Sequence, residues 1–443
     1  MEKKTKLYNF IKAVLIAALA ILIVLGLSKL LVLKSEDGIN QFDALYKQPK
    51  NSIDVLFVGS SKVYCDIATG VLWDDHGIAA FDLGGAEAPA WVSYYQLKEA
   101  LRNQRPKVIC YEVSVAAMYD FSYQKDSWAS DNAYGMKWNE NRIEQLRVNS
   151  EGDSFYLRLN PFNVMHGRYN SLSENDFTNV RNTANYKGFD PRESVVPQEE
   201  PVPVEDCSPC PEKDEEYIRK IIALAREENI PLVLFASPES MPAESQMIIN
   251  YIGTIAEAEG VPFMDFNKSY HAFGMDYATD MADSDHLNYS GNRKFTSYFG
   301  SVLKEQYDLP DRRGDKRYVS WEWDAALQRQ ERNDLAIVNC EDVNEIWNLT
   351  FGSYLVFEIS GDQAILYEDN STVDFQMITE SGDEPFKIAY KSGPDSFLFT
   401  EGMGKEGRIA KIFVNDTEYQ TELRDQIFVY DTMRREFVKS LCY

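Results

Sequence analysis

Residues 53–64 read Ile53-Asp54-Val55-Leu56-Phe57-Val58-Gly59-Ser60-Ser61-Lys62-Val63-Tyr64, an apolar and β-branched run that ends abruptly in a glycine and two serines. A run of this length without helical spacing predicts a buried central strand of a parallel sheet. Open α/β sheets bind ligands at the carboxyl ends of their strands, so the Gly-Ser-Ser turn lies where such a sheet would present a reactive hydroxyl. The same residues are also compatible with a strand-to-helix turn that has no catalytic role.

Strands alternate with helices on both sides of this turn. Further strands are predicted at residues 79–83, 107–113, 231–236 and 262–266, and the last helix of the domain at 288–307. This alternation predicts a parallel sheet with right-handed crossovers, hence an α/β domain over residues 51–307. The long gap between the third and fourth strands predicts an insertion at about 115–211, aromatic and polar at first and then rich in proline.

The composition changes after residue 307. A charged connector is predicted at 308–335, and residues 336–443 contain short apolar runs separated by Gly, Asp and Asn, with almost no helical pattern. Strands at this spacing predict an all-β sandwich. Exposed aromatics such as Trp347, Tyr354 and Tyr390 could stack on sugars, although such residues more often belong to the core.

Charge excludes one class of partner. The chain has 443 residues and a net charge of -25, with 45 Lys and Arg against 70 Asp and Glu. Without a basic stripe, nucleic-acid binding is not expected. The same imbalance disfavours adsorption of the whole chain on anionic lipid.

Residues 1–34 predict a cytoplasmic stub and a transmembrane anchor. Four lysines precede an apolar run at 13–27, and apolar character resumes at 30–33. About 20 apolar residues span a bilayer, and the basic flank places the N-terminus in the cytoplasm. A short polar stalk at 35–50 would then lead to an extracytoplasmic chain. A cleaved signal peptide is the alternative, but no A-x-A-like site follows Leu33.

The six cysteines are too sparse in a chain of 443 residues to predict a disulfide framework. Cys207-Ser-Pro-Cys210 follows an acidic, proline-rich stretch instead of a strand, which predicts a loop with at most one disulfide. A single pair without a second CxxC or a nearby histidine gives no support for zinc, and neither a metal nor another cofactor is expected.

Only four histidines could activate a serine. His76, His166 and His271 are expected at the surface or in packing. His286 differs, because it stands in Asp283-Ser-Asp285-His286, after the last predicted strand and directly before the last helix. One turn would let the Asp283 carboxylate orient the imidazole, and the topology would bring both to the sheet edge that carries Ser61.

These motifs together resemble the SGNH (GDSL-like) hydrolase superfamily over about residues 50–307. Gly59-Ser60-Ser61 is similar to its Gly-Asp-Ser block, Gly84-Gly85 to its second-block glycine, and Asp283-x-x-His286 to its last block. The resemblance implies a flavodoxin-like sheet, Ser61 as nucleophile with Asp283 and His286, and an oxyanion site around Ser60, Gly84 and Gly85. The third-block asparagine has no counterpart after 107–113, where Glu112-Val-Ser114 stands.

The anchor and the C-terminal domain, which is similar to carbohydrate-binding jelly rolls, resemble the envelope acyltransferase branch, DltD-like and alginate O-acetylation-like. This implies a membrane-anchored, extracytoplasmic serine acyltransferase or esterase of a bacterial envelope. It would act on acetyl or alanyl esters of an envelope polysaccharide or teichoic-type polymer, with a multi-spanning membrane acyltransferase as partner. The alternative is a non-catalytic glycan-binding or assembly protein with a degenerate site.

Overall fold

In the computed structural model, the apolar run forms β1 (Val55–Gly59), and Ser61 begins α3 (Ser61–Asp66). Every residue of β1 is buried, as expected for a central strand. The described residues are 2–32, 37–118, 122–178, 187–360, 363–373, 376–378, 387–403, 408–415, 417–422 and 425–442. They belong to two units, Met1–Leu327 and Gln328–Tyr443.

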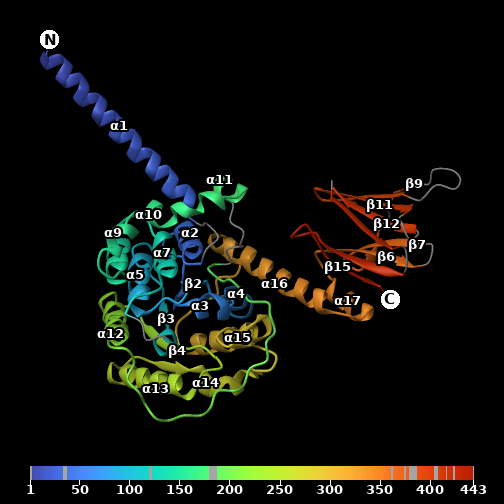
Figure 1. Cartoon of the computed structure of the whole chain (residues 1–443). Coiled ribbons are helices and arrows are strands. Elements are labelled where there is room, and N and C mark those ends of the chain that lie inside the picture. The colour runs from blue at the N-terminus through green and yellow to red at the C-terminus, as the bar shows by residue number, and fades with distance from the viewer. Residues whose placement is uncertain are drawn as a thin grey trace. The chain divides into compact units, whose positions relative to one another are not determined.

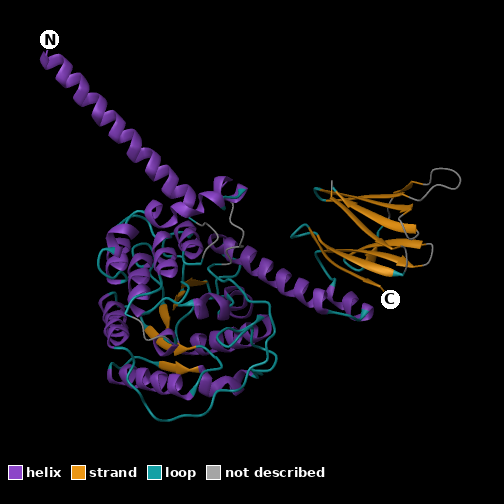
Figure 2. Cartoon of the chain, in the orientation of Figure 1, coloured by secondary structure: helices purple, strands orange, loops and turns teal. Residues whose placement is uncertain are grey.

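The first unit is built on a parallel sheet of five strands in the order β2-β1-β3-β4-β5. Helices surround the strands of this unit (Figure 2). The remaining strands are β2 (Ala80–Gly84), β3 (Val108–Glu112), β4 (Leu232–Ala236) and β5 (Phe263–Asp265). This is the strand order of flavodoxin-like sheets, and it confirms the α/β class predicted from the sequence. The carboxyl ends of β1 and β2 lie side by side, because Gly59 pairs with Gly84.

Alternate residues of each strand enter two cores, one on each face of the sheet. Leu56 and Val58 pack into one core, and Val55 and Phe57 into the other. The first face is covered by α5 (Ala90–Ala100), α12 (Glu212–Glu227) and α13 (Ala243–Ala258). The second is covered by α4 (Thr69–His76), α14 (Phe266–Ser269), η2 (Tyr270–Phe273) and α15 (Tyr289–Gln306).

The predicted stalk differs from the structure in its described part. Residues 39–47 form α2 (Ile39–Lys47), and Phe42 and Leu45 are buried in the core of the sheet's first face. The apolar residues Ile39, Phe42 and Leu45 recur every three positions, so they share one helix face despite the polar residues between them. Residues 39–47 are therefore part of the folded unit.

The insertion is largely helical up to residue 178. It comprises α6 (Val115–Met118), α7 (Asp126–Tyr134), α8 (Glu140–Val148), α9 (Ser154–Arg158), α10 (Pro161–Met165), η1 (His166–Asn170) and α11 (Glu174–Thr178). Residues 193–211 have no helix or strand. Cys207 and Cys210 are both free, so the disulfide considered for this loop is not formed.

The N-terminal segment forms α1 (Glu2–Leu31), which projects from the α/β unit as one long helix (Figure 1). Residues Thr5–Leu31 are long and apolar enough to cross a membrane, at about 1.5 Å of rise per residue against a hydrocarbon core of about 30 Å. The end of α1 is held by the insertion: Ser28 Oγ donates to Asn160 Oδ1 at 2.7 Å, and Arg168 Nη1 donates to the Leu31 carbonyl at 2.5 Å.

The second unit is an antiparallel sandwich. One sheet has the order β15-β14-β6-β7-β8 and the other β13-β12-β11-β10-β9. The first contains β6 (Tyr354–Ser360), β7 (Gln363–Glu368), β8 (Ser371–Thr372), β14 (Gln426–Asp431) and β15 (Glu436–Cys442). The second contains β9 (Gln376–Ile378), β10 (Lys387–Ser392), β11 (Asp395–Met403), β12 (Arg408–Val414) and β13 (Thr417–Glu422). Side chains of both sheets, such as Phe357 and Phe399, share one core.

The predicted connector contains η3 (Lys316–Tyr318) and most of α16 (Val319–Asn339), which is followed by α17 (Val343–Leu349). Trp321 of α16 is buried and donates its Nε1–H to the Ala80 carbonyl at 2.9 Å, so the start of this helix belongs to the first unit. Ile337 near its end packs with Val356 and Val429 on the outer face of a sandwich sheet. A single helix thus runs through the boundary between the units.

Candidate active site

The turn from β1 to α3 fixes which serine hydroxyl meets His286. Ser60 is the N-cap of α3, and its Oγ accepts a hydrogen bond from the Lys62 N–H at 3.3 Å. Gly59 leaves the necessary room, since a Cβ there would stand 2.8 Å from the Cβ of Glu112. Ser61, the first residue of the helix, directs its hydroxyl away from the cap.

His286 lies between Ser61 and Asp283, within hydrogen-bonding distance of both side chains. His286 Nε2 is 2.8 Å from Ser61 Oγ, and His286 Nδ1 is 3.0 Å from each carboxylate oxygen of Asp283. The structure therefore brings together the three residues that the sequence motifs singled out. With Nδ1 bonded to a carboxylate, the neutral ring presents Nε2 as the acceptor for the serine proton.

The Asp283 carboxylate is held in its ionised form. Burial raises its pKa, but the hydrogen bond and charge of His286 and the backbone N–H groups of Asp285 and His286 outweigh this and lower the pKa to about 2. Those N–H groups donate to Asp283 Oδ1 at 2.8 and 2.9 Å. Backbone groups of the loop that carries His286 thus hold the Asp283 carboxylate where it can accept a hydrogen bond from the imidazole.

Helix α3 ties this loop to the serine from both sides of His286. Lys62 Nζ donates to the carbonyl of Asp285 at 2.7 Å, and Asp66 Oδ1 accepts the N–H of Leu287 at 2.8 Å. Both tethers come from the helix that begins with Ser61, so one rigid element sets the distance between hydroxyl and imidazole.

A buried ion pair holds Lys62, which tethers the His286 loop, in place. Lys62 Nζ lies 2.5 Å from Glu239 Oε2, and the two side chains are only 1% and 2% exposed. Burial lowers the pKa of Lys62, but the charges of Glu239 and Asp66 outweigh it and hold that pKa above its usual value. Burial raises the pKa of Glu239 to about 7 against the opposing charge of Lys62. Sequence reasoning missed this pair, because nothing near Lys62 or Glu239 shows that they meet.

Gly84 and Gly85 do not line the site, although the resemblance places them there. The Gly85 N–H donates to the Gly59 carbonyl at 3.2 Å, and a Cβ on Gly84 would stand 2.5 Å from the Ser60 carbonyl oxygen. These glycines allow close approach of β2 to the serine turn. The next residue, Ala86, does line the site, and Gln124 and Asn132 side-chain amides bind its carbonyl at 2.8 Å each.

The three residues open onto a cavity of about 300 Å³. It is lined by Asp37, Ser60, Ser61, Lys62, Tyr64, Ala86, Glu87, Val115, Met118, Trp128, Arg192, Asp285 and His286. Arg192 enters from the insertion, with Nη1 3.1 Å from Asp190 Oδ2 and Nη2 3.7 Å from Asp37 Oδ2. The cavity thus combines a small apolar wall with a guanidinium that is one-third exposed.

The other histidines lie away from this group. His76 Nε2 contacts the Ser297 carbonyl at 2.9 Å, and His166 Nδ1 the Asn163 carbonyl at 3.0 Å. His271 packs against Tyr270 with ring centroids 3.9 Å apart and the rings tilted by 39°. Glu112, found where the family's third-block asparagine was sought, is buried and accepts the N–H groups of Ser114 and Ser237.

No family model matches the chain, and no curated protein matches it. Among solved structures, the chain is similar to a lipolytic protein of the G-D-S-L family from Desulfitobacterium hafniense DCB-2, with 11% identity, a TM-score of 0.31, and coverage of 57% of this chain and 100% of that one. An acylhydrolase-type protein from Bacteroides fragilis NCTC 9343 shows 9% identity and a TM-score of 0.32 over 60% of this chain and 94% of that one.

A gut microbial diltiazem-metabolizing enzyme shows 13% identity and a TM-score of 0.21 over 82% of this chain and 59% of that one.

Proposed function

We propose that this chain is a serine esterase or O-acyltransferase of the SGNH type, with Ser61 as nucleophile. The observation that carries the proposal is the pair of contacts made by His286, 2.8 Å from Ser61 Oγ and 3.0 Å from Asp283. A serine needs an adjacent base to become a nucleophile, and the base needs a third group to orient it. Both requirements are met by residues on two tethered elements.

The reaction proceeds through an acyl-enzyme. Ser61 Oγ attacks the acyl carbonyl while His286 Nε2 takes its proton, and the ester C–O bond breaks as His286 returns that proton to the leaving alkoxide. Water or a sugar hydroxyl then attacks the acyl group with His286 again as base. Asp283 stays ionised throughout and stabilises the imidazolium.

The oxyanion would be held by backbone donors. Ser61 and Ala86 both line the cavity, and their N–H groups have no hydrogen-bond partner in the part of the chain that the structure describes. We assign them this role in place of Gly84 and Gly85. Losing one such donor costs roughly 100- to 1000-fold in rate, so the missing third-block asparagine predicts a modest catalyst.

Hydrolysis of p-nitrophenyl acetate by the full-length chain in detergent tests this function. Wild-type protein should turn over the ester, and Ser61→Ala should abolish the turnover. Ser60→Ala is the matched control, since it removes the neighbouring hydroxyl and its helix cap, worth about 1 kcal/mol, and leaves the Ser61 hydroxyl and its contact with His286 in place. Turnover that persists in Ser61→Ala would refute the proposal. Absence of turnover in the wild type would favour the non-catalytic glycan-binding or assembly protein.

The finer assignment concerns the bacterial envelope. We propose that α1 is an uncleaved single-pass anchor with the N-terminus in the cytoplasm, and that the substrates are acetyl or alanyl esters of an envelope polysaccharide or teichoic-type polymer, as in the DltD-like and alginate O-acetylation-like branch. The active-site cavity of about 300 Å³ suits a small acyl group. Transfer would need a multi-spanning membrane partner to deliver the acyl donor, and co-purification from membranes tests this.

The sandwich unit is proposed to bind the carbohydrate, as a jelly-roll-like module. One of its sheets carries a cavity of about 520 Å³ whose lining includes Tyr390, Lys391 and Asn415. Tyr390 is half-buried, and its ring combines an apolar face with a hydroxyl that donates to Glu368 at 2.9 Å. Tyr354, considered for sugar stacking, is buried and donates to Asp334 at 2.7 Å, and therefore belongs to the core. Loss of polysaccharide retention in Tyr390→Ala would support the role, and unchanged retention would contradict it.

A further inference from the structure

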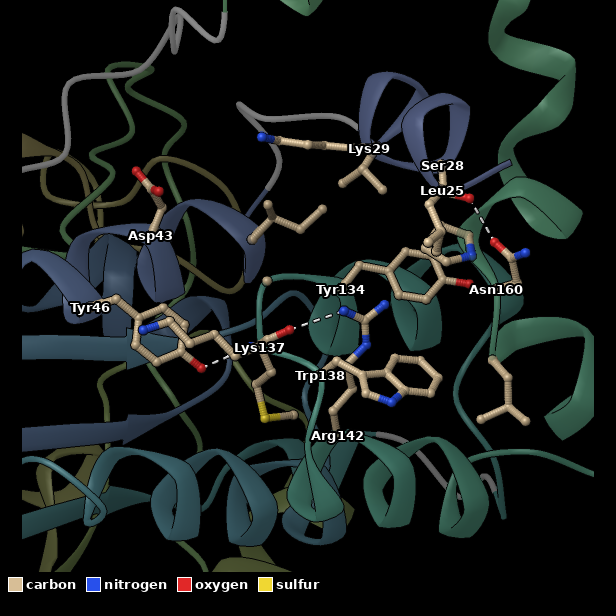
Figure 3. Close-up of a pocket in the computed structure, with 16 residues that line it drawn as sticks. Leu25, Ser28, Lys29, Asp43, Tyr46, Tyr134, Lys137, Trp138, Arg142 and Asn160 are labelled. Atoms are coloured by element: carbon tan, nitrogen blue, oxygen red, sulfur yellow. Dashed lines mark hydrogen bonds between the residues drawn. The ribbon is translucent and has the colours of Figure 1, made fainter. Parts of the chain in front are cut away.

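A second cavity, of about 740 Å³, lies where the end of α1 meets the insertion (Figure 3). It shares no lining residue with the active-site cavity. Its apolar wall comes from separate parts of the chain, namely Leu25, Val32, Ile39, Met136, Leu159 and Pro161. The volume falls in the range of about 300–1,000 Å³ that is usual for ligand sites.

Arg142 of α8 is a buried cation inside this cavity. It is 8% exposed, and its guanidinium lies between the rings of Tyr134 and Trp138, 5.0 and 5.3 Å from their centroids (Figure 3). Nη1 donates to the Met136 carbonyl at 3.0 Å, whereas Nε is buried without a partner. Among the described residues no carboxylate forms an ion pair with it. A buried cation with an unused donor is costly unless an anion approaches it.

Two exposed lysines add to this local positive charge. Lys29 of α1 and Lys137, next to α8, both line the cavity. The one carboxylate among the lining residues, Asp43, pairs with Lys47 at 2.6 Å. The net charge of -25 opposes adsorption of the whole chain to anionic surfaces, but it does not oppose binding of one anionic group among these three cations.

The cavity also stands where α1 would leave a membrane. Ser28, which lines it, is bonded to Asn160 of the insertion, so helix and cavity are joined. Nearby segments expose large aromatic side chains, with Tyr156 67% and Tyr169 73% exposed. Aromatic residues of this kind are enriched at the headgroup level of bilayers. An occupant that is anionic at one end and apolar at the other fits both the position and the lining.

We propose that this cavity binds an anionic phospholipid from the membrane, with the phosphate at Arg142 and the acyl chains beside α1. Lys29 and Lys137 complete the phosphate site, and the apolar wall receives the start of the acyl chains. The inference rests on the proposed anchoring by α1 and is independent of Ser61 chemistry. A bound lipid would hold the α/β unit at a fixed depth relative to the membrane surface.

Native mass spectrometry of the full-length chain tests the site. The protein is released from micelles that contain equal amounts of dioleoyl phosphatidylglycerol and dioleoyl phosphatidylcholine. The wild type should retain the phosphatidylglycerol preferentially. Arg142→Gln should weaken that retention about 10- to 100-fold, the usual effect of losing a charge-assisted hydrogen bond. Arg147→Gln is the matched control, because Arg147 belongs to the same helix but lies outside the cavity and pairs with Glu144.

A double variant, Lys29→Gln with Lys137→Gln, guards against misfolding of Arg142→Gln, because both lysine side chains are exposed. It should also lose the preference for phosphatidylglycerol. Ser61→Ala should keep lipid binding, so failure of the esterase proposal is distinguishable from failure of this one. Equal retention of the two lipids, or retention unchanged in both cavity variants, would overturn the inference. Displacement of the lipid by inorganic phosphate or glycerophosphoglycerol at equal concentration would show a soluble ligand and overturn it as well.

Discussion

At the scale of single residues, the site depends on the Asp283 carboxylate, which groups of its own loop keep ionised. Asp283 is half exposed, yet it accepts two backbone N–H groups of its own loop and faces His286. These donors lower its pKa to about 2 although burial raises it. Protonation of Asp283 therefore cannot limit activity near neutral pH, and the imidazole keeps the orientation that its role as base requires.

Asp283→Asn should reveal this interaction through the pH dependence of stability. The pKa of Asp283 is lowered from 3.8 to about 2 by folding, so its contribution is fully present above about pH 4 and is lost as the pH falls toward 2. The difference in Tm between wild type and variant should be largest near pH 6 and should shrink toward pH 2. A difference that stays constant or grows on acidification would contradict the assigned pKa.

The sequence could identify Ser61, Asp283 and His286 because their motifs lie at places that the topology brings together. It could not identify Lys62 and Glu239, because the burial of a lysine after a serine turn depends on a carboxylate distant in the chain. The resemblance also indicates Gly84 as a donor, whereas Ala86 is the residue that lines the cavity and the one to which we propose to assign that role. Residue types alone do not show which backbone N–H group of the loop after β2 faces the cavity.

At the scale of elements, α3 and the loop that carries His286 behave as one piece. Lys62→Met should remove the Asp285 tether and leave Glu239 buried without a counter-charge, which costs about 3–5 kcal/mol of unfolding free energy. Chemical denaturation measures the loss, and p-nitrophenyl acetate kinetics should show a lower kcat in the same variant.

The double variant Lys62→Met with Glu239→Leu separates the two effects. Replacing both charges by apolar groups should restore most of the stability, because no charge is left buried alone. The lower kcat should persist, since the Asp285 carbonyl still lacks its donor. Recovery of full activity together with stability would show that Lys62 does not position His286.

Helix α2 offers a second test at this scale. Phe42→Ala should lower the unfolding free energy by about 3–5 kcal/mol, because Phe42 is fully buried in the core of the sheet. Lys47→Ala is the control, and its exposed side chain should change stability by less than about 0.5 kcal/mol. Equal, small effects of both variants would show that residues 39–47 are not part of the folded unit.

The strands could be predicted because apolar β-branched runs between turn residues have few other interpretations. The helices of residues 37–50 and of the insertion could not, since Asn40, Gln41 and Asp43 give α2 a polar composition that outweighs its apolar face. The insertion helices α9 to α11 are only five residues long each, too short for a recognisable period.

At the scale of the whole molecule, the proposed envelope location requires the residues beyond α1 to be outside the cytoplasm. A phosphatase that is active only outside the cytoplasm, fused after Asp308, should be active, because the lysines before α1 favour an inside N-terminus. The full-length chain should stay in the membrane pellet after a high-salt wash. An inactive fusion would contradict the envelope assignment, and a shortened soluble product would show cleavage instead of anchoring.

The division into an α/β unit and an all-β unit could be read from the change in composition after residue 307. The boundary itself could not, because α16 continues through it and its two ends pack in different cores through Trp321 and Ile337. A charged helix of this kind has the composition of a linker, and only its few buried side chains distinguish it.

The central claim is that Ser61 is a nucleophile activated by His286, and covalent labelling of the full-length chain tests it most directly. A fluorophosphonate probe should lose fluoride and form one adduct, and peptide mapping should place the adduct on Ser61. Ser61→Ala and His286→Ala should remove the labelling, whereas Ser60→Ala should keep it. No adduct on the wild type, or an adduct on Ser60 or any residue other than Ser61, would contradict the account.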